Sequence, residues 1–293
     1  MQITDTATFF LNGSWVNAGE AAATFYLHTM PPSHGVFEGI RSYATGSGVH
    51  LFRGREHYER LLRSTKAMHM DLNYSVSELM VLTEQLLERN GLTDAYIRPV
   101  VFMDPSPVLS QEPSLMLTAW YWAPSEINHH RNIMTSRYRR PDPTSSPGNA
   151  KVPSHYAYAF MATGEARQKK FDDALMLDQD GYVAQGAMAN FFFEKDDTLY
   201  TAPSGQILDG ITRKSVLKLA REIGFKVEES RFRPEDVWDA DGAFFTSTSL
   251  EIAGIASLDG HGFQKEWEDS MGFDLLLRYQ QAAREVETPM GLI

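Results

Sequence analysis

The hydrophobic and polar positions of this chain follow two different periods, which predict a mixture of helices and strands. Residues 55–70 place their apolar side chains at helical spacing, and a second helical run lies between a capping box that begins at Ser75 and a stop at Gly91. Short runs typical of strands occur at ATFFLNGSWV, with its Asn-Gly turn, and at GVHLFR, AYIRPVVF and SLMLTAWYW.

The later part of the chain is richer in strand patterns. After Lys151, apolar residues recur at helical spacing, and Gly210 opens an amphipathic helix that stops at Gly224. One further apolar strand is predicted over residues 242–255, before a long C-terminal helix. A β-meander is predicted over residues 174–202, with turns at Asp180-Gly181 and Asp196-Asp197.

The hydrophobic pattern lapses over residues 123–134, where we place a linker between two domains. A small α/β domain at residues 1–122 and a larger, β-rich domain at residues 135–293 are therefore expected. The predicted fold class is α+β, with much antiparallel sheet.

Composition narrows the range of partners. The net charge is −11, with no basic block, which argues against nucleic acid or an anionic membrane as the partner. No apolar run approaches the roughly 20 residues of a membrane span, and the first residues lack a signal-peptide pattern. With no cysteine in the chain and the only adjacent histidine pair in the linker, we expect a cytoplasmic protein without a metal site.

The candidate chemistry begins with Lys151, which follows a loop rich in proline and serine. Such a lysine is either a solvated loop charge or a nucleophile. Gly210, Ile211 and Thr212 stand where a helix begins, which is either a plain helix start or a phosphate site, and Arg60 offers a cationic fork. No dinucleotide or P-loop motif is present. Together these features suggest a phosphorylated cofactor that bonds to a lysine, which is pyridoxal 5'-phosphate (PLP).

Several strings make a family resemblance visible over nearly the whole chain. They are GVFEGIRSY, FRGREHYERL, TDAYIRPVVF, LDGITR and TSTSLEI. The chain resembles the fold-type IV PLP enzymes, whose fold is that of D-amino acid aminotransferase, and most closely the branched-chain amino acid aminotransferases.

The resemblance implies a role for individual residues. Lys151 matches the Schiff-base lysine that transfers the proton of the substrate Cα. Tyr156 matches the tyrosine that forms a hydrogen bond to the cofactor phenolate. The other positions assigned to the cofactor are Arg60, Gln185, Ile211, Thr212 and Thr248. The positions assigned to the substrate are Phe37, Gly39, Arg41, Tyr96, Arg98, Ser249 and Leu250.

The chain also departs from the family pattern. Gln185 stands where the family places a glutamate that keeps the pyridine nitrogen protonated. Ala189 replaces another glutamate of the branched-chain enzymes, Ser154-His155 replaces Gly-Asn, and Leu250 replaces a small residue. The segment Met30–His34 replaces one that carries a pocket tyrosine.

The leading hypothesis is a PLP-dependent aminotransferase that exchanges the amino group between a branched-chain-like amino acid and a 2-oxo acid such as 2-oxoglutarate. One alternative is a PLP-dependent lyase of the same fold, similar to the aminodeoxychorismate lyases, which Gln185 and His155 favour. Another is a PLP-binding homologue that catalyses little. The resemblance also implies a homodimer or a higher homo-oligomer.

Overall fold

The chain folds into two compact units. The computed structural model describes residues 7–19, 35–103, 112–123 and 130–285. Unit 1 comprises residues 1–124, 150–153 and 281–293, and unit 2 comprises residues 125–149 and 154–280. Residues 124–129 of the expected linker, and the segment Met30–His34, lie outside the described residues.

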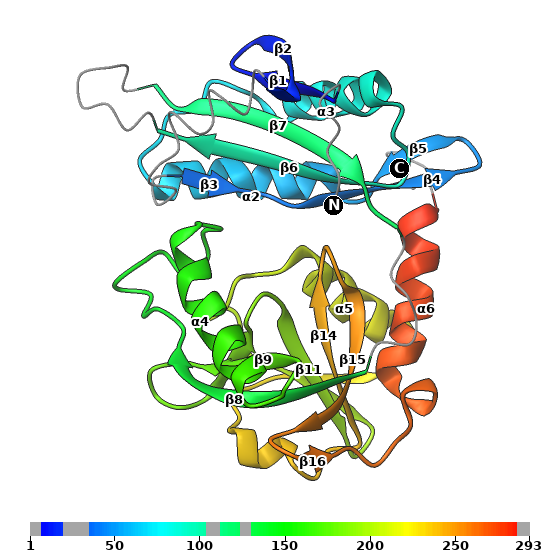
Figure 1. The fold of residues 1–293 in the computed structure, drawn as a ribbon. Coiled ribbons are helices and arrows are strands. Elements are labelled where there is room, and N and C mark those ends of the chain that lie inside the picture. Colours follow the sequence, from blue (N-terminus) through cyan, green and yellow to red (C-terminus); the bar gives the residue numbers. More distant parts are fainter. Residues whose placement is uncertain (1–6, 20–34, 104–111, 124–129, 286–293) are drawn as a thin grey trace, which may run out of the picture. The chain divides into compact units, whose positions relative to one another are not determined.

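Within the described residues, unit 1 is built on a seven-stranded sheet in the order β2-β1-β7-β6-β4-β5, with β3 also paired to β6 (Figure 1). Its neighbouring strands are antiparallel. The strands are β1 (Thr8–Leu11), β2 (Ser14–Asn17), β3 (Gly35–Phe37), β4 (Ile40–Thr45), β5 (Gly48–Leu51), β6 (Ala95–Phe102) and β7 (Ser114–Tyr121).

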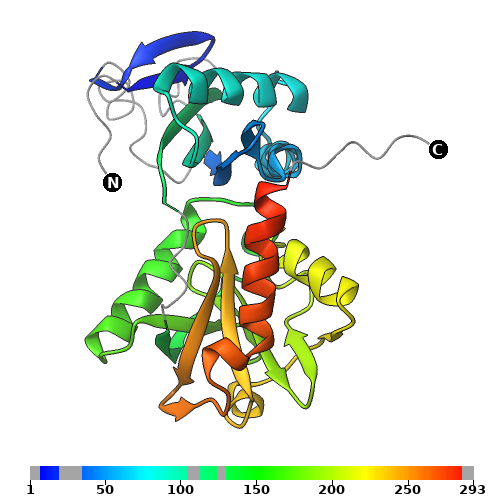
Figure 2. The same ribbon diagram turned by 90° about the vertical axis from the view of Figure 1, so that its right-hand side faces the viewer.

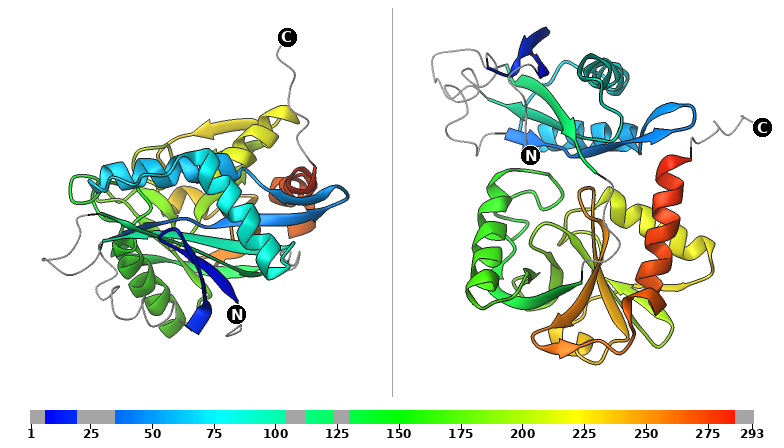
Figure 3. Two further views of the ribbon diagram at one scale, coloured as in Figure 1. Left: turned by 90° about the horizontal axis from the view of Figure 1, so that it is seen from above. Right: turned by 45° about the vertical axis from the view of Figure 1, so that its right-hand side comes forward.

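Two helices, α2 (Gly54–Ala67) and α3 (Val76–Asn90), cover one face of this sheet, as the left view of Figure 3 shows. Buried apolar residues of both helices belong to the core of unit 1. The predicted capping box at the start of α3 is confirmed, because Ser75 and Glu78 exchange side-chain and backbone hydrogen bonds. Gly91 ends α3 with a φ of 60°, as its sequence position predicts. The opposite face of the sheet is not covered by α2 or α3.

Unit 2 is built on a nine-stranded sheet in the order β10-β9-β8-β15-β14-β11-β12-β13, with β16 also paired to β15. Among the helices that the structure describes, none combines the length and the apolar composition of a membrane span. The strands are β8 (Arg131–Arg139), β9 (Asp173–Leu177), β10 (Val183–Gly186), β11 (Asn190–Lys195), β12 (Thr198–Thr201), β13 (Lys226–Glu229), β14 (Gly242–Ser247), β15 (Glu251–Leu258) and β16 (His261–Gly262). The helices are α4 (Ser154–Gln168), α5 (Ile211–Glu222), α6 (Met271–Arg284) and the short 3₁₀ helices η1 (Pro234–Val237) and η2 (Trp267–Asp269).

The predicted β-meander over residues 174–202 is wrong in its topology. The hairpins β9–β10 and β11–β12 both form, but three strands, β8, β15 and β14, separate them in the sheet. The single strand predicted over residues 242–255 is also wrong, because these residues form most of the hairpin β14–β15. Hairpin signals are local, whereas the order of hairpins in a sheet depends on pairing between distant segments.

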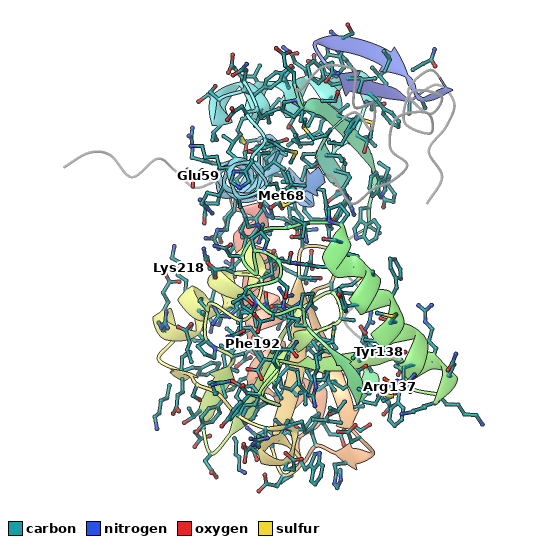
Figure 4. The ribbon with its side chains drawn as sticks, turned by 90° about the vertical axis from the view of Figure 1, so that its left-hand side faces the viewer. Glu59, Met68, Arg137, Tyr138, Phe192 and Lys218 are labelled. Atoms are coloured by element: carbon teal, nitrogen blue, oxygen red, sulfur yellow. The ribbon has the colours of Figure 1, made fainter. Side chains whose placement is uncertain are left out.

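The core of unit 2 is rich in phenylalanine, and β11 buries residues on both of its faces. Phe191 and Phe193 point to one face, while Phe192, labelled in Figure 4, stacks on Phe244 with ring centroids 5.1 Å apart. Figure 2 shows the β14–β15 hairpin beside α6, and a hydrogen bond from Gln280 to Glu251 joins these two elements. The strands that carry the candidate residues of unit 2 are therefore held between packed layers.

Candidate active site

Lys151 is held against unit 1 by its own backbone. Its N–H donates to Oγ of Ser64 at 3.2 Å, and its carbonyl accepts the N–H of Phe37 at 3.1 Å. The neighbouring Ala150 and Val152 are buried in the core of unit 1. Both backbone bonds and both flanking residues fix the position from which the lysine side chain extends.

The sheet face opposite α2 and α3 carries a group of aromatic and cationic side chains. Phe37 lies at its centre, with Nζ of Lys151 4.8 Å and Cζ of Arg98 4.9 Å from its ring centroid. Nη2 of Arg98 lies 3.4 Å from the hydroxyl of Tyr96, and Nε of Arg98 is buried without a hydrogen-bond partner among the described residues. Unit 1 thus brings the predicted lysine together with three of the predicted substrate residues.

Gly39 owes its place in this group to Tyr96. A Cβ atom at position 39 would lie 1.8 Å from the phenol oxygen of Tyr96 and 2.5 Å from Cζ, so no larger residue fits while that ring keeps its position. Arg41 is only 1% exposed, donates from Nη2 to the carbonyl of Ala123 at 3.3 Å and lies over the ring of Tyr43.

Arg60 lies on α2 and is bound to a buried carboxylate, Glu38. Its Nε donates to Oε1 of Glu38 at 2.6 Å and its Nη2 to Oε2 at 2.9 Å. Nδ1 of His57 lies 2.9 Å from the same Oε2. His57, Arg60 and Ser64 recur at i, i+3 and i+7, so one face of α2 presents the Glu38 partners and the acceptor for the Lys151 N–H.

The charges in this cluster follow from burial and pairing. Burial raises the pKa of the Glu38 carboxyl, but attraction to Arg60 and hydrogen bonds from His57 and Arg60 outweigh it and hold that pKa well below its usual range. Burial lowers the pKa of His57 despite the nearby carboxylate. An ionised Glu38 can only accept hydrogen bonds, so a neutral His57 must carry its proton on Nδ1 and donate it.

Gln185 occupies β10 in unit 2, where a register shift between Val183 and Gln185 marks a bulge. Its side chain is 6% exposed. Oε1 accepts the N–H of Leu208 at 3.0 Å, and Nε2 donates to the carbonyl of Gly186 at 3.3 Å. Because a backbone N–H needs an acceptor and a carbonyl needs a donor, both contacts assign the same orientation to the amide.

The predicted phosphate loop is pinned to the same end of the sheet. Asn190 donates to the carbonyl of Leu208 at 2.9 Å, while Leu208 also bonds Gln185. Gly210 then begins α5 without a side-chain cap, and a Cβ there would lie 2.0 Å from Oδ1 of Asn190. The backbone at Ile211 and the buried Thr212 therefore form the first turn of a helix whose N-terminus favours an anion.

The predicted residues Thr248, Ser249 and Leu250 form the tip of the β14–β15 hairpin. The tip is shaped by Oγ of Ser247, which lies 3.2 Å from Oγ of Ser249 and accepts the N–H of Leu250 at 3.1 Å. Thr246 pairs with Asn190 in the sheet, which places this tip at the end of unit 2 where the phosphate loop is held.

Tyr156 lies in the first turn of α4, within electrostatic reach of Arg140. Arg140 is 7% exposed, donates from Nη2 to the carbonyl of Gly148 at 3.1 Å and follows the end of β8. Burial lowers the pKa of Arg140 to about 10, although the nearby Tyr156 opposes this. Arg140 therefore stays cationic at neutral pH beside a predicted cofactor residue. His155, the residue before Tyr156, contacts Oγ of Ser146 through its Nε2 at 2.6 Å.

Unit 1 thus gathers Lys151, Arg60 and the substrate candidates other than Ser249 and Leu250. Unit 2 holds those two with Tyr156, Gln185, Ile211, Thr212 and Thr248. Glu38, His57 and Arg140 were not among the residues predicted from the sequence. An acidic residue inside the apolar run GVFEGI was the one available signal for Glu38.

Comparison with known proteins places this geometry in a family. The family model for class IV amino-transferases matches residues 35–258. The chain is 35% identical over 257 residues to a branched-chain-amino-acid aminotransferase of Pseudomonas aeruginosa, covering 85% of this chain and 84% of that protein. It is 33% identical over 261 residues to the corresponding enzyme of Escherichia coli, covering 86% and 84%.

Solved structures agree with the sequence relatives. The fold matches a T.th. branched-chain amino acid aminotransferase, complexed with N-(5'-phosphopyridoxyl)-L-glutamate, with a TM-score of 0.89 and 31% identity over 97% of this chain and 95% of that chain. A branched-chain aminotransferase from Thermoproteus uzoniensis, with norvaline, matches with a TM-score of 0.88 and 31% identity over 96% of both chains. The predicted α+β, fold-type IV architecture is confirmed. This chain belongs to the class IV aminotransferase family.

Proposed function

We propose that this protein transfers the amino group of a branched-chain amino acid to a 2-oxo acid such as 2-oxoglutarate, with PLP as its cofactor. Transamination and PLP dependence follow from membership of the class IV aminotransferases. The observation that carries the proposal for this chain is Lys151, whose backbone is fixed beside Phe37 and on the α2 face that also presents Arg60.

The residues present fit this cofactor. An uncapped helix start at Gly210 and the hydroxyl of Thr212 suit a phosphate, and the buried Oγ1 of Thr246 has no hydrogen-bond partner among the described residues. Gln185 offers an amide whose oxygen is already bonded to Leu208. These are donors to an anion and to a ring nitrogen, as PLP requires.

PLP, when bound, supplies an aldehyde for attachment to a lysine and a ring that accepts electrons from the substrate Cα. We assign the proton transfer at Cα to Lys151 and the hydrogen bond to the cofactor phenol oxygen to Tyr156, beside cationic Arg140. From the family resemblance we also assign Arg60, Ile211, Thr212 and Thr248 to the cofactor phosphate.

The substrate side is assigned to unit 1 and to the hairpin tip of unit 2. Arg98, with its aromatic neighbours Phe37 and Tyr96, would bind a carboxylate and exclude water. Gly39 provides room for Tyr96 and Arg41 supports this face of the sheet, while Ser249 and Leu250 are assigned to the substrate from the family resemblance.

The lyase alternative rests on Gln185 and His155. His155 contacts Ser146 within unit 2, which accounts for its side chain without a catalytic role. The relatives described above carry aminotransferase names, and transamination is therefore the conclusion.

A homodimer is part of the proposal. Tyr158, Phe160 and Met161 on α4 are 40%, 65% and 42% exposed, and three large apolar side chains on one short stretch of helix suit contact with a second copy. The cytoplasm remains the location proposed from the sequence. Light scattering of the purified protein tests the dimer, and a fully active monomer would contradict it.

The activity is tested by incubating the PLP-loaded protein with 2-oxoglutarate and L-leucine, L-valine, L-isoleucine, L-phenylalanine or L-aspartate. We expect glutamate formation to be fastest with the three branched-chain substrates. Faster reaction with another amino acid would move the substrate assignment, and pyruvate release without glutamate formation would favour the lyase.

A further inference from the structure

Glu38 is the carboxylate that Arg60 and His57 share in unit 1, and its side chain has no exposed surface. Four donors surround its two oxygens. Oε1 accepts from Nε of Arg60 at 2.6 Å, and Oε2 accepts from Nη2 of Arg60 at 2.9 Å, from Nδ1 of His57 at 2.9 Å and from the N–H of Gly39 at 3.2 Å. A carboxylate offers about four lone-pair sites, two on each oxygen, so the three donors on Oε2 use its full capacity and Arg60 takes one site of Oε1.

The two bonds to Arg60 determine how its guanidinium lies. A planar guanidinium held at both Nε and Nη2 by one carboxylate cannot turn about its terminal bonds without breaking at least one bond. His57 also bonds Oε2 of the carboxylate, and the Glu38 backbone is fixed by its own N–H, which donates to the carbonyl of Pro99 at 2.9 Å. The orientation of Arg60 is therefore determined by a group that is itself held at several points.

We propose that Glu38, oriented by His57, is a positioning residue that fixes the Arg60 guanidinium for the phosphate of PLP. This inference rests on the proposed function and assigns Glu38 and His57 a role that the sequence pattern did not give them. Glu38 acts through Arg60 and does not itself touch the cofactor.

The chemistry of the four donors explains why a carboxylate is required at position 38. In Glu38→Gln, one of the two oxygen positions becomes an NH₂ group. If that group takes the place of Oε1, it meets the Nε–H of Arg60, and if it takes the place of Oε2, it meets three donors. In both cases donor faces donor, so the guanidinium must move even though the size of the residue at position 38 is unchanged.

The test compares the affinity of Glu38→Gln for PLP with its affinity for pyridoxal, which has the same aldehyde and ring but no phosphate. Both are titrated into the apo-protein and followed by absorbance. We expect PLP to bind about tenfold to a hundredfold more weakly than to the native protein, as for loss of a charge-assisted hydrogen bond. We expect the affinity for pyridoxal to change less than about twofold, since no phosphate contact is involved.

Glu56→Gln is the matched control, because Glu56 also pairs with an arginine, Arg53, near the start of the same helix, but its side chain is 42% exposed. It should leave both affinities unchanged. His57→Phe removes one donor while the charge of Glu38 stays, and it should weaken PLP binding in the same direction by a smaller factor. This variant serves as the test if Glu38→Gln fails to fold.

A double-mutant cycle with Arg60→Ala shows whether Glu38 acts through Arg60. Once Arg60 is absent, Glu38→Gln should have no further effect on the ratio of the two affinities. An unchanged or stronger PLP affinity in Glu38→Gln, an equal loss for PLP and pyridoxal, or a full effect without Arg60 would each overturn the inference. Failure of the proposed function would look different, because it would appear as absence of glutamate formation by the native protein, whereas these titrations measure only the affinity for the cofactor.

Discussion

Replacing Gln185 by glutamate tests how the protein controls the ring nitrogen of its cofactor. In the native protein, Oε1 of Gln185 accepts the N–H of Leu208 and Nε2 donates one N–H to the carbonyl of Gly186, so the amide has its second N–H to offer to a ring nitrogen. An N–H donor pairs with an unprotonated ring nitrogen, whereas a carboxylate favours a protonated one. The substitution therefore reverses the preferred protonation state of the ring.

The magnitude follows from burial and charge. An opposite charge within about 4–6 Å shifts a pKa by about 1–3 units, and the side chain at position 185 is 6% exposed, which favours the upper part of that range. At about 1.4 kcal/mol per unit, the new ion pair is worth about 1.4–4 kcal/mol. Without cofactor, the new carboxylate loses the bond to the Gly186 carbonyl and faces that oxygen instead, which costs about 1–3 kcal/mol of stability.

The assay uses PLP labelled with ¹⁵N in the ring, reconstituted into both forms, and reads the nitrogen chemical shift across pH. We expect the ring pKa to rise by about 1–3 units in Gln185→Glu, and the half-reaction with L-leucine to become faster. Gln264→Glu, the same change at an exposed position, is the control. Identical nitrogen shifts in the native and Gln185→Glu proteins would refute the reasoning, because they would mean that residue 185 does not contact the ring.

Three further outcomes are expected. Lys151→Ala should abolish covalent attachment of PLP while the circular dichroism spectrum stays native, and borohydride reduction followed by peptide mapping should place the adduct of the native protein on Lys151 and on no other lysine. Gly39→Ala should displace the Tyr96 ring, because the added Cβ would lie 1.8 Å from the phenol oxygen. Steady-state kinetics should therefore show a higher KM for the amino acid, and an unchanged KM would contradict this. Phe192→Ala should lower the free energy of unfolding by about 3–5 kcal/mol in urea titrations, since a fully buried ring stacked on Phe244 is lost; a loss below about 1 kcal/mol would show that the site collapses.

The sequence by itself determined those features that depend on a few neighbouring residues. The capping box at Ser75, the Asn12-Gly13 turn and strand β6 were all predicted from short strings, and the structure confirms them. The left-handed φ values of Asn12 and Gly13, 43° and 84°, are those that an Asn-Gly turn supplies at low energy. The family resemblance was also readable from strings of six to ten residues, and the comparisons confirm it.

Only the tertiary structure decided which distant residues meet. Glu38 and Arg60 are 22 positions apart and Lys151 and Ser64 are 87 apart, and no local pattern indicates either contact. The separation of β10 from β11 in the sheet likewise depends on β14 and β15, which come later in the chain and lie between them. A buried carboxylate is stable only where several donors converge on it, and that convergence is a property of the packed fold, because helix α2 and the segment after strand β3 each supply only part of it.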